Sequence, residues 1–169
     1  MNKSNDSSLM NNIDLRSFSV IELLQLHSAI LEDLKRRKVV RTRNNPIGDY
    51  TEWLVARGLK LKLAENSSAG FDATDPLGTK IQIKGRRIST KNKSRQLGAI
   101  RKLDSKNFDY LAAVIFDNNC YVIDALLIPH RVIYDYANYS AHQNAHILHL
   151  KGPILNDPRI KDIKKDISI

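Results

Sequence analysis

Three polar residues in the middle of the chain, Asp72, Gln82 and Lys84, have the side-chain types that hydrolysis of a phosphodiester uses. A carboxylate and an amide oxygen together can hold a hard divalent cation, which prefers oxygen ligands. An ammonium group beside such a cation can orient the attacking water or stabilise charge on a phosphate. This chemistry depends on a fold that brings the three side chains together.

A short β-hairpin is predicted around these residues. Residues 71–75 and 79–86 have the composition of two strands, and the three-residue turn between them ends in Gly78. Glycine suits the last position of such a turn because it adopts the left-handed conformation without steric penalty. In the register that this turn sets, Asp72 lies opposite Gln82.

The hairpin register predicts which side chains share a face. Side chains alternate along a strand, and facing residues on paired strands point to the same side of the sheet. Asp72, Gln82 and Lys84 are therefore expected on one face, away from the core. The opposite, apolar face is expected to be the core side and consists of Phe71, Ala73, Ile81 and Ile83.

The motif resembles that of the PD-(D/E)XK nuclease superfamily, in which an aspartate precedes an acid-x-lysine triplet on the next strand. Here Asp72 is followed ten residues later by Gln82-Ile83-Lys84. Glutamine in place of the second acid is similar to the Asp…Gln-x-Lys pattern of Mrr-like restriction and repair nucleases. The helical segment 48–52, Gly-Asp-Tyr-Thr-Glu, resembles the first core helix of the superfamily, and the whole chain resembles an uncharacterised bacterial family.

The resemblance covers roughly residues 46–128. It implies an α/β fold with a restriction endonuclease-like core, in which helices flank a central mixed β-sheet. It also implies an endonuclease that cuts DNA with Mg²⁺ or Mn²⁺, as a homodimer where both strands are cut. The implied metal ligands are Asp72, the Gln82 oxygen, the Ile83 carbonyl and Glu52, with Asp49 competing for the place of Glu52, while Lys84 helps to activate water.

The charge distribution indicates a polyanionic partner. The net charge is +9, and residues 80–106 contain ten Lys or Arg but one acid, while residues 35–43 contain six basic residues. Basic residues that neutralise phosphates release counterions, so nucleic acid is the expected partner, DNA first and RNA not excluded. A solvated loop, or complementation of a helix C-terminus, would also account for such segments. The predicted phosphate contacts are Arg86, Arg87, Lys91, Lys93 and Arg95.

The remaining patterns predict the order of the other elements. A capping box at residues 19–22 begins a helix that runs to about residue 37, and Asn45-Pro46 begins a second that Gly58 ends. The expected organisation is a disordered tail (1–12), an extra N-terminal helical extension (13–44) and a nuclease-like domain (45–169). Further strands are predicted at 59–63, 110–117, 121–128 and 145–150, and helices at 129–139 and 157–167.

Several classes of protein are disfavoured. No stretch is long and apolar enough to span a membrane, and the polar N-terminus lacks the order of a secretory signal. Cys120 is the only cysteine, which fits a reducing cytoplasm, and His142, His146 and His149 are expected to be structural or surface residues. Two other functions remain open: a non-catalytic nucleic-acid-binding module that retains the nuclease fold, and a domain that binds an acidic protein.

Overall fold

The computed structural model describes residues 13–65 and 70–168 of the chain. The chain divides into two compact units, Met1–Arg43 and Asn44–Ile169. The predicted disordered tail, residues 1–12, lies outside the described residues. Within the described part of the chain, no helix has the length and apolar character needed to cross a membrane.

The described part of the first unit is mainly one helix, α2 (Val20–Arg36), which follows a short 3₁₀ turn, η1 (Leu15–Ser17). Its predicted capping box is confirmed: the Ser19 N–H donates to Glu22 Oε2 at 2.7 Å, and the Glu22 N–H donates to Ser19 Oγ at 3.4 Å. These bonds satisfy N–H groups that lack a partner within the helix, so the helix begins where the sequence indicates.

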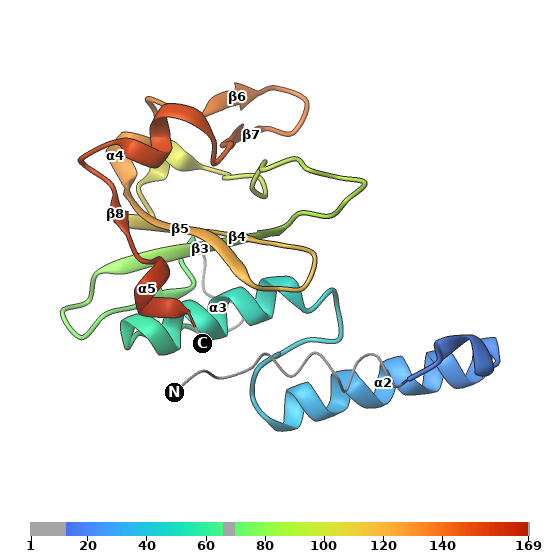
Figure 1. The fold of residues 1–169 in the computed structure, drawn as a ribbon. Helices are drawn as coiled ribbons and strands as arrows, with labels where there is room; N and C mark the ends of the chain where they lie inside the picture. The colour runs from blue at the N-terminus through green and yellow to red at the C-terminus, as the bar shows by residue number, and fades with distance from the viewer. Residues whose placement is uncertain (1–12, 66–69, 169) are drawn as a thin grey trace, which may run out of the picture. The chain divides into compact units, whose positions relative to one another are not determined.

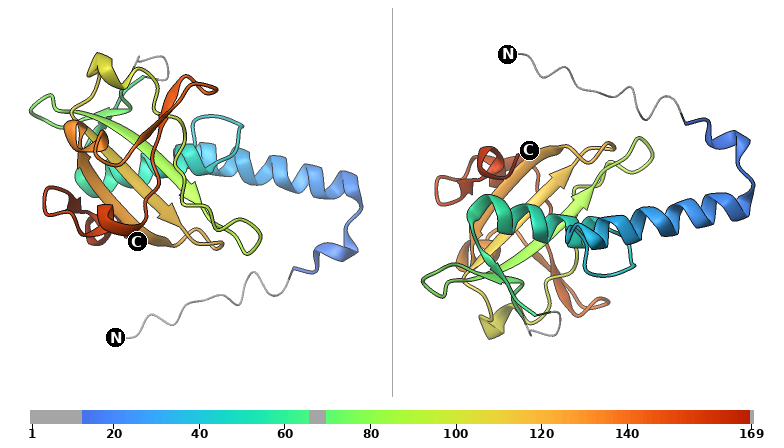
Figure 2. Two further views of the ribbon diagram at one scale, coloured as in Figure 1. Left: turned by 90° about the horizontal axis from the view of Figure 1, so that it is seen from above. Right: turned by 90° about the horizontal axis from the view of Figure 1, so that it is seen from below.

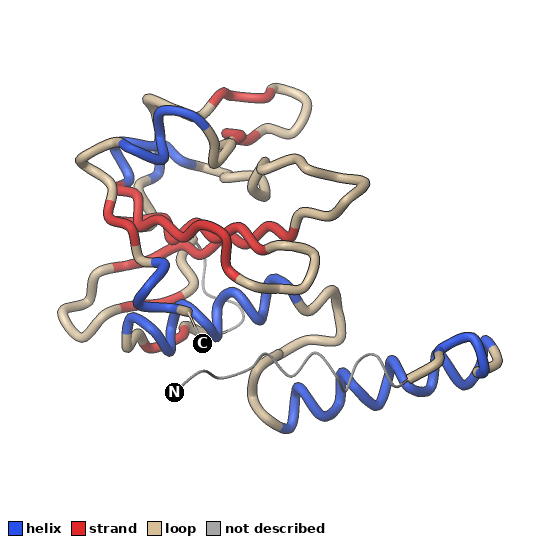
Figure 3. Tube along the Cα trace, viewed as in Figure 1, coloured by secondary structure: helices blue, strands red, loops and turns tan. Residues whose placement is uncertain are grey.

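The second unit is built on a mixed six-stranded sheet in the order β1-β2-β3-β4-β5-β8. Figure 1 labels β3, β4, β5 and β8 of this sheet, and Figure 3 draws the strands in red. Only β3 and β4 run parallel, and all other neighbours are antiparallel. The strands are β1 (Lys62–Leu63), β2 (Ala73–Thr74), β3 (Lys80–Arg87), β4 (Tyr110–Phe116), β5 (Val122–Pro129) and β8 (Lys161–Asp162). A separate hairpin joins β6 (Asn138–Ser140) to β7 (Ala145–Ile147). The predicted α/β class with a mixed sheet is therefore confirmed.

Both faces of this sheet are covered. The helices α3 (Ile47–Leu59) and α5 (Lys164–Ile167) pack on one face, and α3 crosses in front of the strands when seen from below (Figure 2). The other face carries α4 (His130–Ile133) with the two 3₁₀ turns η2 (Leu103–Ser105) and η3 (Gly152–Asn156). The central strand β4 is buried on both sides, as expected for a strand between two layers.

The predicted division of β3 into two faces is confirmed, because Ile81 and Ile83 lie in the core beneath α3 and Gln82 and Lys84 face the other way. The expectation that the polar face lies away from the core is wrong. Gln82 and Lys84 pair in register with Leu111 and Ala113, which belong to the core on the α4 side. The two polar side chains therefore lie beside a second core, and both are half-buried rather than exposed to solvent. The sequence of the hairpin indicates one apolar face only. The residues that cover its polar face lie between positions 97 and 154, far along the chain, so the hairpin sequence could not indicate them.

Phe71 was also assigned to the wrong face. It packs against the core on the α4 side, whereas Ala73, Ile81 and Ile83 belong to the core beneath α3. Strand β2 extends only over Ala73–Thr74, so the alternation that the prediction applied to Phe71 stops before that residue.

Gly58 does not end its helix, contrary to the prediction. Helix α3 continues to Leu59, and Lys60 supplies the left-handed C-cap with φ 56°. A Cβ atom on Gly58 would lie 2.5 Å from the carbonyl oxygen of Asp166. This glycine therefore permits close packing of α5 on α3.

Five predicted elements are much shorter than expected, and two of them are the strands at 71–75 and 145–150, which keep only Ala73–Thr74 and Ala145–Ile147. The helix at 129–139 ends at Ile133, the strand at 59–63 keeps only two residues, and the helix at 157–167 is replaced by β8 and the one-turn α5. In the last case Asp157 accepts hydrogen bonds from Arg159 Nη2 and Tyr136 Oη, both at 2.6 Å. These contacts favour a local turn over a helix.

Candidate functional site

The β2–β3 hairpin has the predicted register. Ala73 pairs with Ile81, and Gly78 has φ +84°, in the left-handed region that the turn requires. The Asp75 carboxylate accepts the N–H groups of Leu77 and Thr79, each at 2.8 Å. Two hydrogen bonds from Thr79 lower the pKa of Asp75, and the bond from the Thr79 side chain has a larger effect than the bond from its backbone. The turn is therefore held by an ionised side chain at neutral pH.

Asp72 and Gln82 meet across this hairpin. Gln82 Nε2 donates a hydrogen bond to Asp72 Oδ2, and the Ile83 N–H donates to the same oxygen at 2.6 Å. All three polar groups are partly buried. Two donors thus orient the carboxylate, while the Ile83 side chain lies in the core beneath α3.

Lys84 lies on the same side of β3 as Gln82, two residues further along the strand. A Cβ atom on Gly98 would lie 3.8 Å from Lys84 Cδ, so the aliphatic stem of the lysine runs beside that glycine. Lys84 is half-buried. The aliphatic part of Lys84 is therefore packed against the protein, which restricts the positions that its ammonium group can take.

Helix α3 lies close to β3 at Gly85, where a Cβ atom would lie 2.9 Å from Thr51 Cβ and closer still to the Thr51 hydroxyl. Thr51 Oγ1 also donates to the Ile47 carbonyl at 2.5 Å. Glu52 and Asp49, both half-buried, are on this helix, which packs on the face of β3 opposite to that of Gln82 and Lys84. Thr51 and Gly85 are not predictable from the sequence, because their contact joins segments distant in the chain.

Among residues 13–65 and 70–168, no three His, Cys, Asp or Glu side chains gather into a metal-binding group. A cation here would therefore rely on few protein ligands, with the Asp72 carboxylate and the Gln82 amide as the converging pair. A half-turn of the amide exchanges its nitrogen and oxygen, which presents a second oxygen beside the carboxylate. This donor set fits Mg²⁺, which commonly uses one or two carboxylates and keeps several waters.

Replacing Gln82 with glutamate provides a test of this donor set that does not depend on catalysis. Two carboxylates would then lie in direct contact, so their repulsion should lower the melting temperature at pH 7 in EDTA. Added Mg²⁺ should raise the melting temperature of Gln82→Glu by more than that of the wild type, because a bound cation offsets the repulsion. Thermal unfolding with and without Mg²⁺ measures both effects. Equal Mg²⁺ shifts in the two proteins would contradict the ligand assignment.

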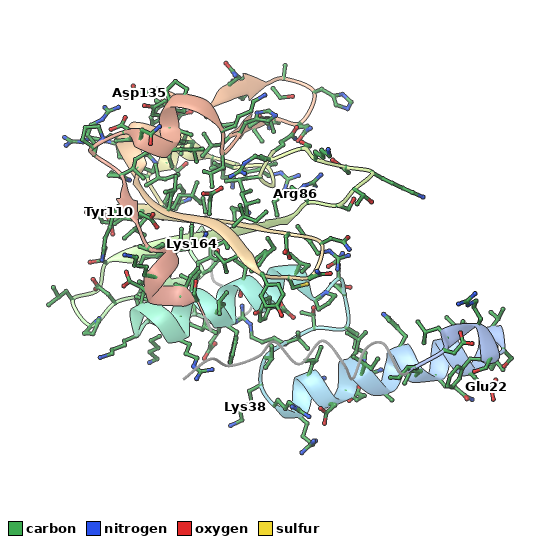
Figure 4. The ribbon with its side chains drawn as sticks, in the orientation of Figure 1. Glu22, Lys38, Arg86, Tyr110, Asp135 and Lys164 are labelled. Atoms are coloured by element: carbon green, nitrogen blue, oxygen red, sulfur yellow. The ribbon has the colours of Figure 1, made fainter. Side chains whose placement is uncertain are left out.

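Four of the predicted phosphate-binding residues follow the motif on β3 and the loop after it. Arg87, Lys91 and Lys93 are exposed, and Arg86 lies beside the loop, with its Nε donating to the Ser94 carbonyl at 3.3 Å (Figure 4). Arg95 differs from them. It forms an ion pair with Asp124 and donates to the Leu150 carbonyl at 2.6 Å, so it joins the loop to β5 and to the segment after β7.

No protein-family model matches the chain, and no curated protein matches it either. The geometry around Asp72 and the charge of the chain are therefore the features that indicate a function.

Proposed function

We propose that this protein is a metal-dependent endonuclease that hydrolyses phosphodiester bonds of DNA, and that its α/β domain is a restriction endonuclease-like fold of the PD-(D/E)XK type. The contact between Asp72 and Gln82 across the hairpin, with Lys84 on the same side of β3, carries this proposal. The net charge of +9 supports a nucleic-acid substrate.

Each residue has a distinct role in the proposed reaction. Asp72 and Gln82, with the Ile83 carbonyl, would hold the Mg²⁺ or Mn²⁺ ion, whereas Glu52 lies on the helix that covers the opposite face of β3 and is left out of this ligand set. When bound, such a cation polarises the phosphate and lowers the pKa of water. Lys84 positions the attacking water and stabilises the charge that develops on the phosphate. The protein acts as a homodimer on duplex DNA, in the cytoplasm, where a lone Cys120 is compatible with reducing conditions.

The exposed basic residues after the motif bind the DNA backbone in this proposal. Replacing Arg87, Lys91 and Lys93 together with serine should weaken duplex binding uniformly across sequences. It should also reduce the slope of log affinity against log salt by about 3, one for each lost phosphate contact. Fluorescence anisotropy with labelled duplex DNA from 50 to 300 mM KCl measures the slope. An unchanged slope would remove these three residues from the interface.

Plasmid nicking in Mg²⁺ or Mn²⁺, with EDTA as the control, tests the proposed reaction. Conversion of supercoiled plasmid to open-circular and linear forms is the expected result. Salt-dependent DNA binding without cleavage in either metal would instead support a non-catalytic nucleic-acid-binding module. The uncharged Gln82 favours that second function, because an amide supplies less charge to a cation than the acid it replaces.

A further inference from the structure

A pocket of about 470 Å³ lies between residues 101–104, which run into η2, and the β6–β7 hairpin. Its volume lies in the range of small-molecule binding sites. The side chains that give it chemical character are Arg101, Lys102, Asp104, Tyr139 and His146. It thus combines an aromatic wall with two cations and one carboxylate.

The aromatic wall is Tyr139, which is 60% exposed although several contacts hold it. Its ring packs edge-to-face on His146 with centroids 5.4 Å apart, and His146 packs in the same way on Tyr134 at 5.7 Å. The Tyr139 hydroxyl donates to Asn144 Oδ1 at 2.9 Å. A ring that is fixed at its edge and open to solvent can stack with a planar ligand at little entropic cost.

The charged groups of the pocket suit a nucleotide. Arg101 and Lys102 are exposed cations that can neutralise a phosphate. The Asp104 carboxylate accepts the Tyr134 hydroxyl through Oδ1 at 2.8 Å. Burial of the hydroxyl raises the pKa of Tyr134, and the hydrogen bond to Asp104 raises it further. The tyrosine therefore remains protonated and donates at neutral pH. The second carboxylate oxygen can accept a hydrogen bond from the amino group of a base.

The pocket is tied to the candidate catalytic site through the backbone. Lys84 runs beside Gly98, and Arg101 follows Gly98 by three residues, which span at most about 11 Å. Two hydrogen bonds between Ile100 and His146, at 2.9 and 3.0 Å, fix this segment to β7. A nucleotide in the pocket would therefore lie close to a phosphate at Lys84.

We propose that this pocket binds an unstacked base next to the phosphate that is cut. Consequently the preferred substrate is DNA with unpaired nucleotides, because unstacking costs least where a base has no partner. This inference rests on the proposed nuclease function, and it assigns Tyr139 as a specificity-determining residue of the same site.

Binding measured in EDTA separates this inference from catalysis. Labelled duplexes of equal length, one fully paired and one with a central two-nucleotide bulge, are titrated by fluorescence anisotropy. Wild-type protein should bind the bulged duplex more tightly. Tyr139→Ala should lose roughly fivefold to a hundredfold in affinity for the bulge, the range expected for loss of base–aromatic stacking, with little change for the paired duplex.

Two control variants make the result specific. Tyr121→Ala removes a tyrosine of similar exposure, 59%, from the β4–β5 turn and should leave the preference intact. Tyr139→Phe keeps the ring, loses the bond to Asn144 and should retain most of the preference. The inference is wrong if wild type binds both duplexes equally, or if Tyr139→Ala behaves like Tyr121→Ala. Absence of plasmid nicking with an intact bulge preference would overturn the nuclease proposal alone.

Discussion

Replacing Lys84 with methionine is expected to lower the rate of plasmid nicking in Mg²⁺ about 10²- to 10³-fold, the loss typical of removing one charge-stabilising donor. Methionine retains an unbranched stem beside Gly98 but removes the ammonium group. The melting temperature should therefore change little. The expected loss comes from the transition state, where Lys84 would meet the charge developing on the phosphate.

A second lysine of the same strand supplies the control. Lys80 lies four residues earlier on β3, and its Nζ is 5.3 Å from the centre of the Phe71 ring. Lys80→Met removes the same charge from the same strand, so it should lower cleavage only as far as it weakens DNA binding. Equal losses in Lys84→Met and Lys80→Met would show that Lys84 contributes net charge alone.

Asp72→Asn tests the other half of the site in the same assay. The asparagine oxygen can still accept the Ile83 N–H, so the hairpin should persist, while the charge needed for a cation is lost. Nicking should fall at least as much as in Lys84→Met. Unchanged cleavage in both variants would place the active site elsewhere in the chain.

The sequence predicted those features that depend on neighbouring residues. The capping box at Ser19 and Glu22 and the left-handed Gly78 follow from local backbone chemistry, and both are present. The contact between Asp72 and Gln82 follows in turn from the hairpin register, because a three-residue turn leaves few alternatives. Short-range rules therefore sufficed for the centre of the candidate site.

The features that the sequence did not predict depend on long-range packing. The second core that covers Lys84 is contributed by residues 97 to 154, and no periodicity within β3 indicates it. Tyr139 was expected in a helix, yet it lies in β6, where pairing with His146 forms the stacking wall. Pairings of this kind outweigh local propensity.

The contact between Thr51 and Gly85 is one such long-range feature, and it lies next to Lys84 in the sequence. Gly85 follows Lys84 directly, and Thr51 precedes Glu52 directly. Because the glycine has no side chain, α3 lies against β3 at this point. The distance between α3, which carries Glu52, and β3, which carries Lys84, therefore depends on the absence of a side chain at residue 85.

Gly85→Ala is expected to reduce the free energy of unfolding by about 1–3 kcal/mol, the usual cost of overpacking a core. Its Cβ would lie 2.9 Å from Thr51 Cβ, which the helix backbone holds in place, so α3 has to move. Urea unfolding measures the loss, and Gly48→Ala, on the same helix with no atom within 4 Å of the new Cβ, is the matched control.

The double variant Gly85→Ala with Thr51→Gly separates a steric effect from a backbone effect. Removing the threonine side chain relieves the contact at Gly85, although glycine inside a helix itself costs about 1 kcal/mol. The double variant should therefore be more stable than the sum of the two single changes, and the difference is their coupling energy. If the changes in the free energy of unfolding of the two single variants simply add in the double variant, the alanine at residue 85 destabilises the protein through the conformation of the strand and not through contact with Thr51. Since a shift of α3 also disturbs β3 next to Lys84, Gly85→Ala should lower the rate of DNA cleavage more than the loss of folded protein accounts for, and the double variant should recover part of that rate.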